Sequence, residues 1–175
     1  VTGCFGGEVR LWNLTKSTQL HSWKAHSDRV CSIAWSPLST LTYSASGEVE
    51  GQSSNVFIAT ASSDSKEMNN QIADISGHMG RVSAIAFIQV VEIEDGIDMK
   101  IVLGTVSYDT SFRLWDIETG KQLLLQDGHA REIMGIDFQC DGSVVATATN
   151  QVYVEFGIYG QEEVFQLYKY DRKGD

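Results

Sequence analysis

The sequence predicts an all-β chain built from four-stranded antiparallel units, and three observations lead to that fold class. The apolar segments are short and rich in β-branched and small residues, as strands are. No segment keeps the 3.6-residue period of a long amphipathic helix, and the single proline, Pro37, follows a predicted strand. A histidine-led pattern also recurs about every fifty residues, a period typical of solenoids, propellers and arrays.

The repeat is measured from His26, His78 and His129, which stand 52 and 51 residues apart. Apolar residues follow each histidine after four, seven and nine positions. The three apolar sets are Val30, Ile33 and Trp35; Val82, Ile85 and Phe87; and Ile133, Ile136 and Phe138. Identical offsets in three copies predict three equivalent strands, each entered from an equivalent loop.

Further strands are predicted by composition. The alternation in "EVRLWNL" and "SFRLWDI" indicates half-buried strands, and "FIATAS", "KIVLGTVS" and "SVVATAT" carry the small and β-branched residues of strands packed between sheets. Glu118-Thr119-Gly120 predicts a short hairpin loop before "KQLLL", and Asp141-Gly142 predicts a second turn. Residues 151–175 can form strands but do not follow the repeat.

The order Gly-His, apolar strand, Asp-Gly, small-residue strand, Ser-x-Asp and Leu-Trp-Asp resembles the WD repeat of WD40 β-propellers. The resemblance implies a partial propeller of about three to four four-stranded antiparallel blades that is not closed. It divides the chain into the end of a blade (1–24), a repeat (25–76) with an insertion at 39–55, the best repeat (77–127) with an insertion at 88–98, and a divergent last repeat (128–175). An unclosed array also exposes sheet edges that can pair with another chain.

The resemblance further implies a buried hydrogen-bonded set of His, Ser or Thr, Asp and Trp, which is favourable only when every member is satisfied. The best set consists of His78, Ser107, Asp109 and Trp115. We expect the other blades to be looser, because each lacks at least one member. His26, Ser62 and Asp64 match, but the Trp position of their repeat falls in "SKEMNNQ". Trp12 is present, but Cys4 and Gly6 occupy the Ser and Asp positions of its repeat. After His129, the Ser, Asp and Trp positions are occupied by Thr149, Gln151 and Gly157.

Residues 72–87 and 106–148 are most similar to the WD-repeat subunits of the spliceosomal U4/U6 small nuclear ribonucleoprotein. Those repeats pair an "RLWD…ETG…LLLQ.GH" run with a following "I.F..DGS..AT". The resemblance implies a nuclear scaffold in the U4/U6·U5 tri-snRNP of pre-mRNA splicing, with protein partners, indirect or weak snRNA contact and no small-molecule substrate. The alternative is a WD-repeat substrate receptor of a ubiquitin ligase, or a signalling scaffold.

Charge and motifs exclude several other functions. The net charge of −10, from 13 basic and 23 acidic residues, disfavours a bulk nucleic-acid or anionic-membrane surface. No apolar run reaches the roughly 20 residues of a membrane helix. The sequence contains no P-loop, dinucleotide fingerprint or GxSxG motif, so we expect no enzyme.

Metal and cofactor sites are not expected either. Cys4, Cys31 and Cys140 are odd in number and no two are close in sequence, so neither a disulfide framework nor a CxxC zinc site is implied, and reduced thiols are expected. His21 and His26 lack two nearby partner ligands for zinc. The acidic residues between 92 and 98 fit no calcium loop and indicate a solvated insertion.

Three arginines are the candidate partner-binding residues. Arg29 and Arg81 stand three residues after the repeat histidine, and Arg131 stands two after it. Equivalent loops open on the same rim of a propeller, so the three arginines would form an arc able to reach carboxylates, phosphate or an RNA backbone. The alternative is local pairing with acids such as Asp28 or Glu132.

Overall fold

The computed structural model describes residues 1–37, 56–64, 75–92, 98–127, 129–140, 142–150, 153–158 and 165–169. Within these ranges the chain forms β-strands, turns and bends, without a helix. No helix in this part of the chain is therefore long and apolar enough to cross a membrane.

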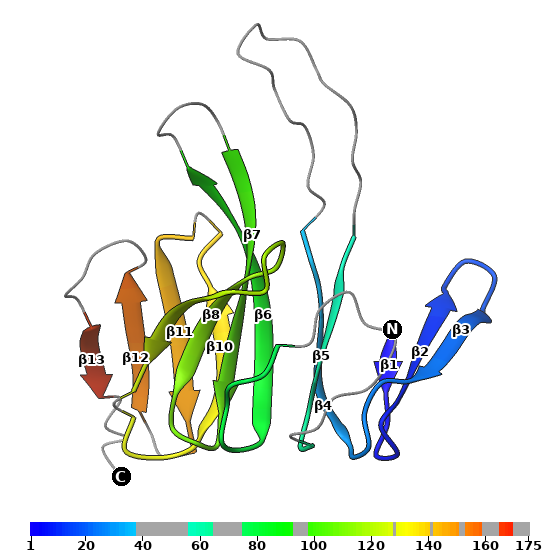
Figure 1. The fold of residues 1–175 in the computed structure, drawn as a ribbon, viewed down its shortest axis with the longest axis horizontal. Helices are drawn as coiled ribbons and strands as arrows, with labels where there is room; N and C mark the ends of the chain where they lie inside the picture. Colours follow the sequence, from blue (N-terminus) through cyan, green and yellow to red (C-terminus); the bar gives the residue numbers. More distant parts are fainter. Residues whose placement is uncertain are drawn as a thin grey trace, which may run out of the picture.

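The strands form four antiparallel sheets, which we call blades 1 to 4 (Figure 1). Blade 1 contains β1 (Thr2–Gly3), β2 (Glu8–Asn13) and β3 (Thr18–Lys24). Blade 2 contains β4 (Val30–Trp35) and β5 (Ile58–Ser62). Blade 3 contains β6 (Val82–Glu92), β7 (Asp98–Ser107), β8 (Phe112–Asp116) and β9 (Gln122–Gln126). Blade 4 contains β10 (Ile133–Phe138), β11 (Val144–Thr149), β12 (Tyr153–Ile158) and β13 (Phe165–Lys169).

The blades stand side by side in chain order, because β1 contacts β4, β4 contacts β6, and β6 contacts β10 (Figure 1). Each sheet has the order of its strands in the sequence, and none closes on itself. The predicted fold class is therefore confirmed: the chain is all-β, with several antiparallel sheets in an unclosed array, consistent with a partial WD40 propeller.

The repeat is also visible in backbone irregularities. The ladder between the first two strands shifts register at Val30/Ser32 in blade 2, Val82/Ala84 in blade 3 and Ile133/Gly135 in blade 4. In every case the extra residue is the one directly after the first strand residue, namely Cys31, Ser83 or Met134. A bulge at the same place in three blades shows that the repeated sequence builds the same local backbone.

The β6–β7 hairpin is longer than the sequence predicts. Its ladder runs to the pair Glu92↔Asp98, whereas β8 pairs with β7 only as far as Val102↔Asp116. The two-stranded ribbon therefore projects beyond the rest of blade 3 (Figure 1). Residues 88–92 and 98 were expected in an inserted loop but lie in paired strands. Three of the five residues in "IQVVE" are β-branched, a composition that favours strands, and Ile88 lies opposite Val102. Residues 93–97, and the insertion at 39–55, lie outside the described residues.

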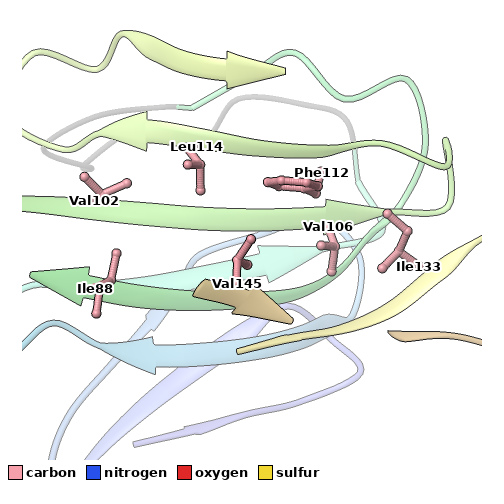
Figure 2. Close-up of a cluster of buried hydrophobic side chains, with 7 residues drawn as sticks. All are labelled: Ile88, Val102, Val106, Phe112, Leu114, Ile133 and Val145. Atoms are coloured by element: carbon pink, nitrogen blue, oxygen red, sulfur yellow. The ribbon is translucent and has the colours of Figure 1, made fainter. Parts of the chain in front are cut away.

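The core lies between blades. One buried cluster joins blade 3 to blade 4, and Figure 2 shows its seven side chains: Ile88, Val102, Val106, Phe112, Leu114, Ile133 and Val145. A second cluster, Ala61, Ile85, Leu103 and Trp115, joins blade 2 to blade 3. Strand alternation explains both, since successive residues of β7 face opposite neighbours: Leu103 faces blade 2, and Val102 faces blade 4.

Small residues allow the sheets to approach closely. A Cβ added at Gly104 would lie 2.6 Å from the Phe138 ring and 2.8 Å from Ile136. The side chains of β10 therefore pack against β7 at Gly104, which has no side chain of its own. The residue in this register of β5 is Ala59, which packs in the cluster that Phe87 joins. The phenylalanines nine positions after His78 and His129 thus pack where the preceding blade has a small residue.

Candidate functional site

A directed chain of hydrogen bonds connects strands and loop in blade 3. The Trp115 Nε1–H donates to Thr105 Oγ1 at 2.9 Å, and the indole has no accepting atom. Thr105 Oγ1 lies 2.8 Å from His78 Nε2, and His78 Nδ1 lies 2.9 Å from an Asp109 carboxylate oxygen. Because the carboxylate accepts, His78 carries its proton on Nδ1, and Thr105 donates to Nε2.

Burial and charge agree with this neutral imidazole. Burial lowers the pKa of His78 and outweighs the opposing effect of Asp109. Burial alone would raise the pKa of Asp109, but hydrogen bonds from Ser111, His78 and the Met79 amide lower it to about 2. Asp109 therefore stays ionised and ties the loop at Met79 to the turn between β7 and β8.

The order hydroxyl, imidazole, carboxylate is also that of nucleophilic triads, but the geometry here is structural. Thr105 is only 6% exposed, and its oxygen already accepts from Trp115. A nucleophile must be open to a substrate and face an oxyanion hole. Thr105 is instead enclosed between two sheets, where its hydroxyl satisfies two buried polar groups.

The same threonine position recurs in all four blades. In blade 2, His26 bonds Thr60 Oγ1 at 2.9 Å and Asp64 at 3.0 Å. In blade 4, His129 Nε2 lies 2.9 Å from Thr147 Oγ1. In blade 1, Trp12 Nε1 donates to Thr2 Oγ1 at 2.9 Å. The threonine hydroxyl is thus hydrogen-bonded to the tryptophan in blade 1, to the histidine in blades 2 and 4, and to both in blade 3.

The bridging hydroxyl differs from the one expected from the sequence. Ser107 is fully buried, but its Oγ accepts from the Asp109 amide at 3.1 Å, and the hydroxyl on His78 belongs to Thr105. Ser62 likewise accepts from the Asp64 amide and donates to the Arg29 carbonyl. Residues two apart on a strand share a face, so both hydroxyls were plausible.

A sequence signal for the missed threonines exists. Thr2, Thr60, Thr105 and Thr147 each stand four residues before the Asp position of their repeat, occupied by Gly6, Asp64, Asp109 and Gln151. The serine position is less regular, with Cys4, Ser62, Ser107 and Thr149. The residue present in every copy is therefore the threonine.

Two expected gaps fall outside the described residues: the missing Trp position of blade 2, in 65–71, and Gln151 of blade 4. His129 is itself 6% exposed, and burial lowers its pKa. Gly157, at the Trp position of blade 4, lies in β12 opposite Val145.

The predicted rim arginines lie at one end of the blades. Arg29 and Arg81 end the loops that enter β4 and β6, next to the β1–β2 and β7–β8 turns. Arg131 lies in the equivalent loop before β10 and is exposed. The β2–β3 and β8–β9 turns and the long β6–β7 hairpin lie at the opposite end, because the strands are antiparallel (Figure 1).

Arg29 and Arg81 each stack on an aromatic ring. The Arg29 guanidinium carbon lies 5.6 Å from the centre of the Phe5 ring, and that of Arg81 lies 5.0 Å from the Tyr108 ring centre. Arg29 Nε also donates to Ser63 Oγ, while Arg81 Nε donates to Cys31 Sγ.

Each of these arginines therefore bridges two blades: Arg29 joins the β1–β2 turn of blade 1 to blade 2, and Arg81 joins blade 2 to blade 3. Arg10 forms an ion pair with Glu8, and His26 and His78 contact the carboxylates of Asp64 and Asp109; none of these three contacts involves a rim arginine. Asp28 bonds the Arg29 amide, and Glu132 bonds Asn150.

No group of three or more His, Cys, Asp or Glu side chains in the described ranges is arranged to hold a metal ion. His21 stacks on Trp23, with ring centres 5.6 Å apart. Cys4, Cys31 and Cys140 are free thiols. Of the acidic run, Glu92 and Asp98 pair across the hairpin backbone, and residues 93–97 are not described.

Comparison with protein families agrees with this geometry. A model of the WD40 family, described as WD domain, G-beta repeat, matches residues 17–66. The matched segment begins just before β3, the last strand of blade 1, and ends after β5 of blade 2. It supports the WD40 family for this chain and a role in protein–protein interaction, since WD40 domains are generally non-catalytic scaffolds.

Proposed function

We propose that this chain is a non-catalytic WD-repeat scaffold that captures protein partners on the rim formed by Arg29, Arg81 and Arg131. The observation that carries the proposal is that two of the three arginines are stacked on aromatic rings and join successive blades. An arginine held in this way loses little side-chain entropy when it meets a carboxylate.

The surroundings of the rim favour an acidic protein segment that also carries an apolar side chain. Met79 and Phe5 are 94% and 81% exposed beside the arginines. Arg, Met and aromatic residues are the types enriched at the centres of protein interfaces. The chain as a whole has a net charge of −10, so three arginines at one end are a local site for an anionic partner rather than part of a basic surface for nucleic acid.

The test is charge reversal at the rim. Arg29→Glu and Arg81→Glu together should weaken partner capture by roughly tenfold or more, the scale of interface hot spots. The matched control reverses two exposed lysines at the opposite end, Lys16→Glu with Lys121→Glu, and should leave capture unchanged. Equal capture by both double variants and the unaltered chain, with unchanged circular dichroism, would refute the rim.

We further propose that the partners belong to the U4/U6·U5 tri-snRNP and that the chain acts in the nucleus. Support comes from the resemblance of residues 72–87 and 106–148 to the U4/U6 WD-repeat subunits. A tagged chain incubated with nuclear extract should recover U4 and U6 RNA together with snRNP proteins, with recovery reduced in the rim variant. Recovery of cullin adaptors without these RNAs would instead support a ubiquitin-ligase receptor.

A further inference from the structure

Two of the rim arginines, Arg29 and Arg81, come from loops of different blades but contact the same pair of side chains. The Arg29 Nε donates to Ser63 Oγ at 3.3 Å, and the Arg81 Nε donates to Cys31 Sγ at 3.2 Å. Ser63 Oγ and Cys31 Sγ are themselves 3.4 Å apart. Three short contacts in a row therefore hold two guanidinium groups at the two ends of one hydroxyl–thiol pair, and we call these residues the arginine cluster.

Aromatic rings fix the two cations in this arrangement. Arg29 lies over the Phe5 ring of blade 1, and Arg81 lies over the Tyr108 ring of blade 3. Like charges held close together repel each other. No acidic side chain in the described ranges forms an ion pair with either guanidinium group. The cluster is therefore a fixed pair of positive charges without a paired negative charge in this part of the chain.

The two acids next to the cluster in the sequence have other partners. Asp28 accepts from the backbone amide of Arg29. Asp64 accepts from the backbone amide and the hydroxyl of Ser27, and it contacts His26. Both carboxylates thus bind the backbone of the loop that carries Arg29, and the guanidinium groups remain open to another anion.

The cluster is confined to the junction of blades 2 and 3. In blade 4 the position equivalent to Arg29 and Arg81, three residues after the repeat histidine, is occupied by Glu132. Glu132 accepts from Asn150 at 3.1 Å. Arg131 stands one residue earlier and is not part of the cluster.

We infer that the arginine cluster binds the phosphate of a phosphorylated residue in the protein partner. The inference rests on the proposed rim and names the group that the rim recognises. A phosphomonoester carries about −1.5 to −2 charge at neutral pH and three acceptor oxygens, so it matches two guanidinium groups where a carboxylate matches one. Ser63 Oγ accepts from Arg29, which leaves its hydroxyl hydrogen for a phosphate oxygen.

Charge also selects the source of the phosphate. A phosphate of an RNA backbone is a diester with a single negative charge, and the net charge of −10 on the chain opposes a long polyanion. A phosphorylated side chain brings a doubly charged group without that repulsion. Phe5 and Met79 are exposed beside the cluster and offer apolar contacts to the residues that flank the phosphorylated one.

The test compares three small anions at neutral pH: the phosphomonoester N-acetyl-O-phosphoserine amide, the carboxylate N-acetylglutamate α-amide, and the diester dimethyl phosphate. Binding is followed through the arginine Nε–H signals in proton–nitrogen correlation NMR spectra. The monoester should shift the Arg29 and Arg81 signals in parallel and bind roughly tenfold or more tightly than either monoanion. The Arg10 signal is the internal control and should stay in place, because Arg10 is paired with Glu8.

Variants separate the cluster from general attraction to positive charge. Ser63→Ala and Arg81→Lys should each weaken monoester binding by roughly tenfold, whereas the matched control Arg10→Lys should not change it. An unchanged amide spectrum shows that each variant folds.

Monoester binding no tighter than carboxylate binding would overturn the inference, even if the Arg29→Glu, Arg81→Glu variant loses partner capture. Diester binding as tight as monoester binding would also overturn it, because a nucleic-acid backbone would then fit equally well. Tight monoester binding together with partner capture that survives the double variant would refute the proposed function alone.

Discussion

Removing a single oxygen from blade 3 tests the hydrogen-bonded chain described above. Thr105→Val keeps the shape of the side chain but deletes the hydroxyl that joins Trp115 to His78. Both partners are enclosed: Trp115 is 4% exposed, and the His78 side chain is 5% exposed. Water cannot readily replace the lost bonds, so the indole N–H and the imidazole Nε2 are left unpaired.

The expected cost follows from counting those two groups. A buried donor or acceptor left without a partner costs roughly 1–3 kcal/mol, so the two groups together should lower the free energy of unfolding of Thr105→Val by about 2–6 kcal/mol. Thr60→Val in blade 2 is the matched control, because the described side-chain partner of Thr60 is His26 alone. It should cost roughly 1–3 kcal/mol, and the difference between the variants measures the indole bond.

The measurement is equilibrium unfolding in urea, followed by circular dichroism and tryptophan fluorescence at neutral pH. Thr105→Val should shift the midpoint to lower urea more than Thr60→Val does, with the slope unchanged. A smaller shift for Thr105→Val than for Thr60→Val would refute the bridging role of Thr105. So would a cost below about 0.5 kcal/mol, the range of ordinary surface substitutions.

Three further predictions concern packing, pH and local stability. Gly104→Val should drive a side chain into the Phe138 ring and lower the free energy of unfolding by roughly 1–3 kcal/mol. The control Gly135→Ala places nothing within 4 Å of the new Cβ and should not destabilise the fold. Equal shifts of the two variants in thermal melting would contradict the close approach of β10 to Gly104. Because burial lowers the pKa of His78, its contribution to stability is present above about pH 6.5 and declines as the pH falls toward its folded pKa. Asp109, with a pKa of about 2, adds a loss as the pH falls below its ordinary value of 3.8; urea midpoints that rise between pH 7 and pH 5, or that change identically in His78→Gln, would count against this. In hydrogen exchange, β6–β9 should be the best-protected strands because they hold the complete chain from tryptophan to carboxylate, and uniform protection of all blades would disprove that ranking.

Local pattern accounts for much of the fold. The offsets from His26, His78 and His129 locate β4, β6 and β10, because a strand entered from a repeated loop needs its apolar residues at the same positions. The turn at Gly120 follows from local chemistry as well, since its φ of 67° is readily adopted by glycine. The repeat also predicts the His78–Asp109 contact, although the two residues are 31 positions apart in the sequence.

Local pattern alone could not distinguish Thr105 from Ser107 as the partner of His78, because side chains two residues apart point to the same face of a strand. Local pattern also could not predict the stacking of Arg29 on Phe5 or the contact of Arg81 with Cys31, because these residues lie on different blades and are far apart in the sequence. Nor did it predict the extension of the β6–β7 ladder past Ile88. The sequence by itself determined the strands, their period and the histidine positions, since these depend on neighbours within a few residues. The tertiary structure decided which hydroxyl bridges and what each arginine touches, since these depend on how one sheet is placed against the next.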